Sequence, residues 1–149
     1  MQCLEQCNAR HLSASDLIAA DAYPESPDGP FDAKSGFDLV TGDLSFISLT
    51  LVLPALAPLV KPGGVLLMLV KPQFELQPAQ IGKGGIVRDA ALYALVEQRL
   101  RAACTALGLT DLQWLASPIT GGDGNREFFI FARRGHDLEP TTNHAASPP

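Results

Sequence analysis

The feature that most restricts the fold is a continuous apolar run, VLLMLV (65–70), which ends on Lys71 and is followed directly by Pro72. An apolar run without polar alternation is typical of a strand that is covered on both faces, as in the sheets of α/β proteins. A buried strand that ends on a cation needs a partner for the charge. Lys71 therefore either contacts a ligand at the end of the strand or is neutralised there by neighbouring carboxylates.

The segments before this run alternate between strand and helix patterns. FDLVTGD (37–43) predicts a short buried strand. SLTLVLPALAPLV (48–60) has apolar residues at helical spacing and predicts a helix, although Pro54 and Pro58 interrupt it. The KPGG stretch (61–64) is expected to end this helix. Alternation of this kind indicates an α/β sheet.

The segments after the run predict a helix and a hairpin. Residues 89–108 have a helical apolar face, with Asp89 able to cap the start and Gly108 the end. Residues 109–118 and 126–134 predict two strands. Because the GGDG turn between them is short, the two strands should pair antiparallel and close the sheet as a hairpin.

Composition favours one domain, 1–134, followed by a disordered tail, 135–149. The chain has 149 residues, of which 46% are hydrophobic, and the tail is rich in Pro, Ser, Thr and Asn. A polar stretch, 21–36, holds several prolines and glycines and should be an exposed loop. No apolar run is long enough for a spanning helix, and the N-terminus lacks the regions of a signal peptide. We therefore expect a cytoplasmic protein without a membrane partner.

Charge and metal-ligand spacing restrict the possible partners. The net charge is −5 and the isoelectric point is about 5.0, so any affinity for nucleic acid must come from a local patch or from another domain. The cysteines are odd in number and show no CxxC spacing, which is typical of reduced thiols. The histidines have no ligand spacing either, so we assign no metal site.

Three charged residues are predicted to meet at one edge of the sheet. Asp43 and Lys71 end two central strands, and the carboxyl ends of parallel strands are where α/β folds bind ligands. Glu127 begins the last strand, and an antiparallel strand begins at that same edge. A lysine between two carboxylates near an apolar wall can act as a general base for a hydroxyl group. The alternative is that Asp43 and Glu127 only neutralise Lys71.

Two further residues could contact a cofactor. Phe46, close to Asp43, could stack on a flat ligand or belong to the core. Glu5 lies at the end of the predicted strand MQCLE (1–5), where a carboxylate often binds a cofactor ribose, or it is a solvated strand-end residue. No glycine-rich strand–loop–helix unit precedes this strand, although such a unit normally begins a cofactor-binding sheet.

Cations gather near the same edge. The loop IGKGGIVRD (81–89) carries Lys83 and Arg88 but has the spacing of neither the phosphate loop nor the dinucleotide fingerprint. These two cations, together with Arg126, could contact an RNA backbone. The alternatives are an ordinary surface loop and, for Arg126, an ion pair with Asp123.

The chain resembles the TlyA (haemolysin A-like) family, whose members carry an FtsJ-like (RrmJ-type) methyltransferase domain. The resemblance covers about residues 4–134 and rests on motifs in a fixed order. These are NARHL, DLVTGDLSFISLTLVLPALAPLVKPGG, LVKPQFE, GKGGIVRD and SPITGGDGNREFFIFARR.

The resemblance implies a Rossmann-like fold that binds S-adenosylmethionine and methylates 2′-hydroxyls of cytidines in ribosomal RNA. FtsJ-like enzymes use a Lys–Asp–Lys–Glu tetrad, and Asp43, Lys71 and Glu127 match its last three members. With this family in view, Glu5, Asp43 and Phe46 are candidate cofactor contacts, and Lys83, Arg88 and Arg126 are candidate RNA contacts.

Departures from the family pattern concern the N-terminus. The first tetrad lysine, the glycine-rich loop with its strand and helix, and the small RNA-binding domain are not found in this sequence. We therefore expect an incomplete methyltransferase fold whose first strand would lie between the strands ending at Glu5 and Asp43. This chain alone should be inactive and bind S-adenosylmethionine weakly or not at all. The alternative is an inactive remnant or a partner module that associates through its exposed sheet edge. A membrane-active haemolysin is not supported, because the sequence shows no basic amphipathic helix.

Overall fold

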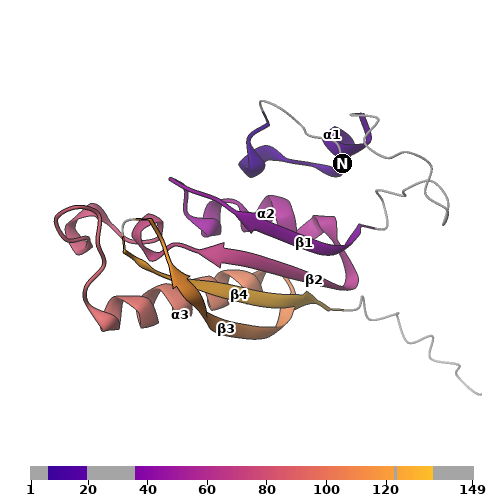
Figure 1. Ribbon diagram of the computed structural model, residues 1–149. Coiled ribbons are helices and arrows are strands. Elements are labelled where there is room, and N and C mark those ends of the chain that lie inside the picture. Colours follow the sequence, from indigo (N-terminus) through magenta and orange to yellow (C-terminus); the bar gives the residue numbers. More distant parts are fainter. Residues whose placement is uncertain (1–6, 20–35, 123, 136–149) are drawn as a thin grey trace, which may run out of the picture.

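The computed structural model describes residues 7–19, 36–122 and 124–135 (Figure 1). The predicted strand at 1–5 lies outside the described residues. So do the predicted loop and tail, apart from Gly36 and Gly135. The helices and strands are α1 (Ala14–Ala19), β1 (Phe37–Asp43), α2 (Leu53–Leu56), β2 (Val60–Val70), α3 (Ala90–Ala106), β3 (Leu109–Thr120) and β4 (Arg126–Arg134). Short 3₁₀ turns are η1 (Ala9–His11), η2 (Leu49–Leu51), η3 (Ala57–Leu59), η4 (Pro72–Phe74) and η5 (Pro78–Gln80).

The sheet has the strand order β1-β2-β4-β3, with β1 parallel to β2 and the other pairs antiparallel (Figure 1). The predicted strand at 37–43 and the antiparallel hairpin are confirmed. The prediction that residues 37–43 are buried is wrong, because β1 lies at the edge of the described sheet and each of its residues is half-buried or exposed. β2 begins at Val60 rather than at residue 65, because Val60 already pairs with Phe37 before the register shifts. Gly63, at φ 77°, lies in this irregular stretch.

The predicted helix at 48–60 is wrong as a continuous element. The segment forms η2, the single turn α2 and η3 in succession. Pro54 and Pro58 each occupy the first or second position of a short turn, because proline has no N–H to donate within a helix. The apolar residues of the segment still face the core, where Val52, Leu53 and Leu56 are buried.

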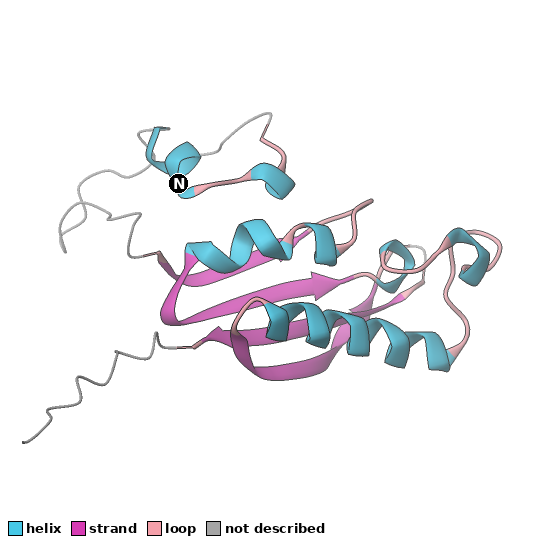
Figure 2. Cartoon of the chain, turned by 180° about the vertical axis from the view of Figure 1, so that it is seen from behind, coloured by secondary structure: helices cyan, strands magenta, loops and turns pink. Residues whose placement is uncertain are grey.

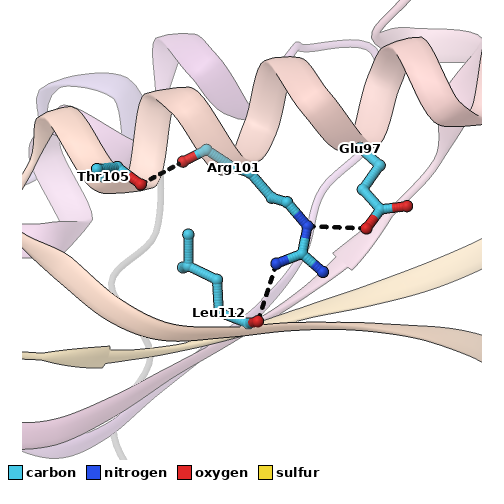
Figure 3. A network of polar contacts seen from close by, with 4 residues as sticks. All are labelled: Glu97, Arg101, Thr105 and Leu112. Carbon is cyan, nitrogen blue, oxygen red and sulfur yellow. Dashed lines mark hydrogen bonds and ion pairs between the residues drawn. The ribbon is translucent and has the colours of Figure 1, made fainter.

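The long helix agrees with its prediction. Asp89 caps α3 by accepting a hydrogen bond from the Ala91 N–H at 2.9 Å, and Gly108 lies just beyond its end at φ 75°. Figure 3 shows how α3 is attached to β3. Arg101 donates to the Glu97 carboxylate and to the Leu112 carbonyl, both at 2.8 Å. Thr105 donates to the Arg101 carbonyl at 3.0 Å.

Helices cover one face of the sheet in the described part of the chain. Figure 2 shows α2 and α3 on the same side of the strands. Residues Leu66, Met68 and Val70 point to this side and are buried, whereas the alternate residues of β2 are only half-buried. The uncovered side, which we call the open face, carries Leu39, Val65, Leu67, Leu69, Leu115, Phe129 and Phe131. The expectation of a strand covered on both faces is therefore wrong for the residues described. The apolar run supplies side chains to both faces, but no described helix packs on the second.

Truncating a leucine side chain of β2 should lower the free energy of unfolding more on the helix-covered face than on the open face. We expect Leu66→Ala to lower the free energy of unfolding by about 2–5 kcal/mol, because it leaves a cavity in the core. Leu67→Ala, the matched control on the open face, should cost about 1 kcal/mol or less, because its side chain is already partly hydrated. Urea unfolding followed by circular dichroism measures both. Equal losses would show that the open face is covered in solution.

Candidate active site

Asp43 and Lys71 meet at the carboxyl edge of the sheet, because β1 and β2 are parallel and end side by side. The Lys71 Nζ lies 2.5 Å from the Asp43 Oδ1 and donates to the Ser45 Oγ at 3.1 Å. The Lys71 side chain is only 15% exposed, whereas that of Asp43 is 63% exposed. An ammonium has three N–H donors. Among the described residues, Asp43 and Ser45 take two of them, which leaves the third donor without a partner there.

Glu127 occupies the neighbouring strand at the matching position. β2 and β4 pair Val70 with Phe128, so Lys71 and Glu127 follow as the next opposed pair. The Glu127 side chain is buried. A Cβ at Gly121 would come within 2.6 Å of its Oε1, so glycine at this position leaves room for the carboxylate. Among the described residues, no ion pair joins Glu127 to Lys71. The predicted trio is therefore brought to one edge, but only Asp43 contacts the lysine.

Phe46 is held in an unusual backbone conformation. Its φ is 63°, a region that bulky residues rarely adopt and that is often associated with function. The side chain is 90% exposed, and its ring centroid lies 4.9 Å from that of Phe74. An exposed aromatic ring three residues past the end of β1 is not part of the core. The ring is accessible to a flat ligand at the sheet edge. Glu5, another predicted cofactor contact, lies outside the described residues.

Glu75 is a site residue that sequence reasoning missed. Its Oε1 accepts from the Leu49 N–H at 2.7 Å, and its Oε2 accepts from the Ser48 Oγ at 2.6 Å. Burial raises the pKa of this carboxyl group, while the bonds from Leu49 and Ser48 and the charge of Arg99 lower it. An acidic residue within the otherwise uncharged stretch PQFEL was the available signal.

Gln73, in the same loop, has a buried amide oxygen without a hydrogen-bond partner in the described structure. A buried acceptor without a donor costs free energy. A donor from a ligand or from another part of the protein would remove that cost.

Asn125 was also missed, and it organises the basic loop. Its Oδ1 accepts from the Val87 N–H, and its Nδ2 donates to the Gly85 carbonyl, both at 2.9 Å. The side chain is buried between the two segments it joins. The loop that carries Lys83 and Arg88 is thereby attached to the turn that precedes Arg126.

Arg126 packs on aromatic rings. Its guanidinium lies 5.5 Å from the centroid of Tyr93 and 5.7 Å from that of Phe128. The Tyr93 hydroxyl donates to the Val87 carbonyl at 2.7 Å, so the same tyrosine also holds the basic loop. The predicted alternative, an ion pair with Asp123, involves a residue outside the described part. The three candidate RNA-contacting cations therefore belong to one connected region.

In the described ranges, no group of His, Cys, Asp and Glu side chains is arranged to hold a metal ion. In the same ranges, none of the helices has the length and apolar character needed to cross a membrane.

Glu75 should make stability depend on pH. Because burial raises its pKa above 4.5, the folded protein keeps a proton that the unfolded chain has already released. The stabilisation from this group is complete below about pH 4.5 and is lost as the pH rises through the folded-state pKa. Glu75→Gln should therefore remove a fall in unfolding free energy over that window, measured by urea titration at several pH values. Glu97→Gln, at a half-exposed glutamate of α3, is the control and should leave the fall in place. An unchanged pH profile in Glu75→Gln would contradict the prediction.

The chain is similar to known proteins over 68–90% of its length. The chain is 46% identical over 102 residues to YqxC of Bacillus subtilis, a match that covers 68% of this chain and 36% of that protein. It is 38% identical over 134 residues to the 16S/23S rRNA (cytidine-2′-O)-methyltransferase TlyA of Mycobacterium tuberculosis, covering 90% of this chain and 44% of that protein. The chain thus spans less than half the length of these curated relatives.

A solved structure of a hemolysin-like protein from Streptococcus thermophilus superposes with a TM-score of 0.71. The two chains are 33% identical, and the match covers 89% of this chain and 44% of the other. The family described as FtsJ-like methyltransferase matches residues 1–134. The chain therefore belongs to the FtsJ-like methyltransferase family.

Proposed function

We propose that this chain is the C-terminal part of an S-adenosylmethionine-dependent methyltransferase that modifies ribose 2′-hydroxyls of cytidines in ribosomal RNA. The observation that carries the proposal is the Lys71 ammonium, held by Asp43 and Ser45 at the ligand-binding edge of the sheet. The name of the relative TlyA gives the reaction and the substrate, and that relative matches almost the whole chain. Ribosomal RNA as the substrate implies a cytoplasmic location.

Lys71 acts on the hydroxyl that receives the methyl group. Its remaining N–H binds the 2′-oxygen, while Asp43 and Ser45 fix the ammonium in place. The positive charge stabilises the negative charge that develops on the oxygen, and the hydroxyl proton passes to the exposed Asp43 carboxylate or to solvent water as the new oxygen–methyl bond forms. Glu127, on the neighbouring strand one position beyond the Val70–Phe128 pair, adds a second carboxylate to this corner. Much of the acceleration then comes from orientation of the nucleophile.

The cofactor contacts are partly present in this chain. S-adenosylmethionine supplies an activated methyl group when it is bound. Phe46 fits this cofactor because its ring is exposed and held at positive φ beside Asp43. Phe46 would stack on the adenine, and Asp43 and Glu5 would bind the polar groups of the nucleoside. The glycine-rich loop of such sheets is not found in this sequence.

The RNA contacts come from the connected basic region. Lys83, Arg88 and Arg126 supply positive charge that phosphates attract, despite the net charge of −5. Asn125 supports this role, because it joins the loop of the first two to the strand of the third. The rest of the RNA affinity would come from the larger protein.

The alternative function, a partner module, rests on the sheet itself. In the described sheet, β1 has β2 as its only neighbour. An apolar hollow of about 310 Å³ lies beside it, with Leu12 and Leu17 on one side and residues of β1 and α2 on the other. The open face and this edge would accept further secondary structure. We propose that other parts of the family domain pack there, which makes the exposed edge a requirement of the methyltransferase rather than a separate function.

Replacement of the lysine should abolish methylation. In a full-length relative, we expect Ala at the position of Lys71 to lower kcat by about 10²–10⁴-fold, because the hydroxyl loses its positioned cation. Arg at this position keeps the charge but not the compact ammonium, so it should not restore the rate. Transfer of labelled methyl groups to ribosomal subunits measures the effect. Ala at the position of Lys61, which pairs with Asp38 at the other end of β2, is the control and should leave the rate unchanged. Retained activity without the lysine would exclude its role.

The chain alone should not bind S-adenosylmethionine in the micromolar range. Phe46 and Asp43 supply only part of the contacts, and the sequence lacks a glycine-rich loop for the rest. Calorimetric titration of the 149-residue chain, beside a full-length relative as the positive control, checks this. Micromolar binding to this chain would contradict the prediction.

A further inference from the structure

Glu75 joins the two loops that carry the site residues. Its carboxylate, 4% exposed, accepts from the Leu49 N–H at 2.7 Å and from the Ser48 Oγ at 2.6 Å. Both donors belong to the loop that follows β1, whereas Glu75 belongs to the loop that follows β2. The carboxylate therefore bridges the two loops directly.

The backbone of Glu75 is fixed as well. Its N–H donates to the Pro72 carbonyl at 3.0 Å, which closes the turn η4. Its carbonyl accepts from the Arg99 Nη1 of α3 at 2.5 Å. The next residue, Leu76, is buried in the core. The main chain of Glu75 is thus anchored to the turn and to α3, and the hydrogen bonds of its carboxylate attach the loop after β1 to both.

The contacts within the candidate site run between the same two loops. Lys71 precedes Glu75 in one loop and donates to Ser45 in the other at 3.1 Å. Phe74 lies in the first loop, and its ring centroid is 4.9 Å from that of Phe46 in the second. A change in the separation of the loops would alter both contacts at once. The two hydrogen bonds of the Glu75 carboxylate join the same two loops.

We propose that Glu75 is a positioning residue for methyl transfer, whose carboxylate holds the loop after β1 at the distance that orients Lys71 and Phe46. The inference rests on the proposed function of this site. If the side chain at position 75 only filled space, an apolar residue there would give a more stable protein, because burying a carboxylate costs free energy. Capping of η2 does not account for it either, because the Ser48 Oγ already accepts from the Thr50 N–H at 3.2 Å.

The test observes Lys71 in this chain without any need for activity. The chain has lysine at positions 34, 61, 71 and 83, so labelling with ¹³C,¹⁵N-lysine gives few Cε–Nζ signals, each assignable by a Lys→Arg variant. In the unaltered chain we expect the Lys71 signal to differ from those of exposed lysines, with two inequivalent Hε protons, because its Nζ is held by Asp43 and Ser45. In Glu75→Gln this signal should move toward the position of exposed lysines, while that of Lys61 stays in place. A Lys71 signal unchanged by Glu75→Gln, or already like that of an exposed lysine, would overturn the proposal.

Two further variants separate positioning from stability. Ser48→Ala removes one of the two bonds to the carboxylate and should shift the Lys71 signal in the same direction, even if Glu75→Gln does not fold. Leu109→Ala removes a buried side chain at the opposite end of the sheet. It should lower stability and leave the Lys71 signal in place. A shift in Leu109→Ala as large as that in Ser48→Ala would show that any loss of stability moves Lys71, and would overturn the proposal.

Kinetics then tests the catalytic meaning. In a full-length relative, Gln at the position of Glu75 should lower kcat by about 100-fold and leave KM for RNA unchanged, because misplacement affects the reacting geometry. An unchanged kcat would overturn the proposal. Retained activity without the lysine itself would instead defeat the proposed function, and the Lys71 signal would still report whether Glu75 holds the loops.

Discussion

The pairing of β2 with a parallel strand on one side and an antiparallel strand on the other determines the rest of the structure. The parallel pair brings the ends of β1 and β2 together, and with them Asp43 and Lys71. The antiparallel pair brings the beginning of β4, and with it Glu127, to the same edge. Two directions of pairing around one central strand thus place three charged side chains at one edge, although long stretches of sequence separate them.

The pattern of the sequence was sufficient for the elements that local periodicity defines. The strands at 37–43 and 126–134, the helix α3 and the contact of Asp43 with Lys71 follow from apolar runs, caps and strand ends. The continuous helix predicted at 48–60 was wrong, because the helical spacing of apolar residues continues through prolines that break the hydrogen bonding of a helix. The prediction that the strand of the apolar run is covered on both faces failed for another reason. An apolar run shows which residues can be covered, but not whether the described chain supplies the cover.

The bonds of Glu75 and Asn125 could not be predicted from the sequence. Each joins segments that lie 26 or more residues apart, and each depends on a single side chain that reaches a backbone amide. Such a contact has no periodicity, and its residue type is common in exposed loops. The candidate cations at Lys83 and Arg88 were recognised by their charge, but the loop between them is held by Asn125 and Tyr93, which are both uncharged.

In the function that we propose, the two partners of the methyl transfer depend on one short segment of this chain. The acceptor side needs Lys71, which follows directly from the end of β2. The donor side needs Phe46, whose positive φ costs about 1–3 kcal/mol and persists only where surrounding contacts impose it. Those contacts come from Phe74 and, through Ser48 and Leu49, from Glu75. The stretch from Lys71 to Glu75 therefore carries the cation and also supports the strained platform. Under the proposed function, a change within this stretch would therefore affect the positions of the nucleophile and of the cofactor together.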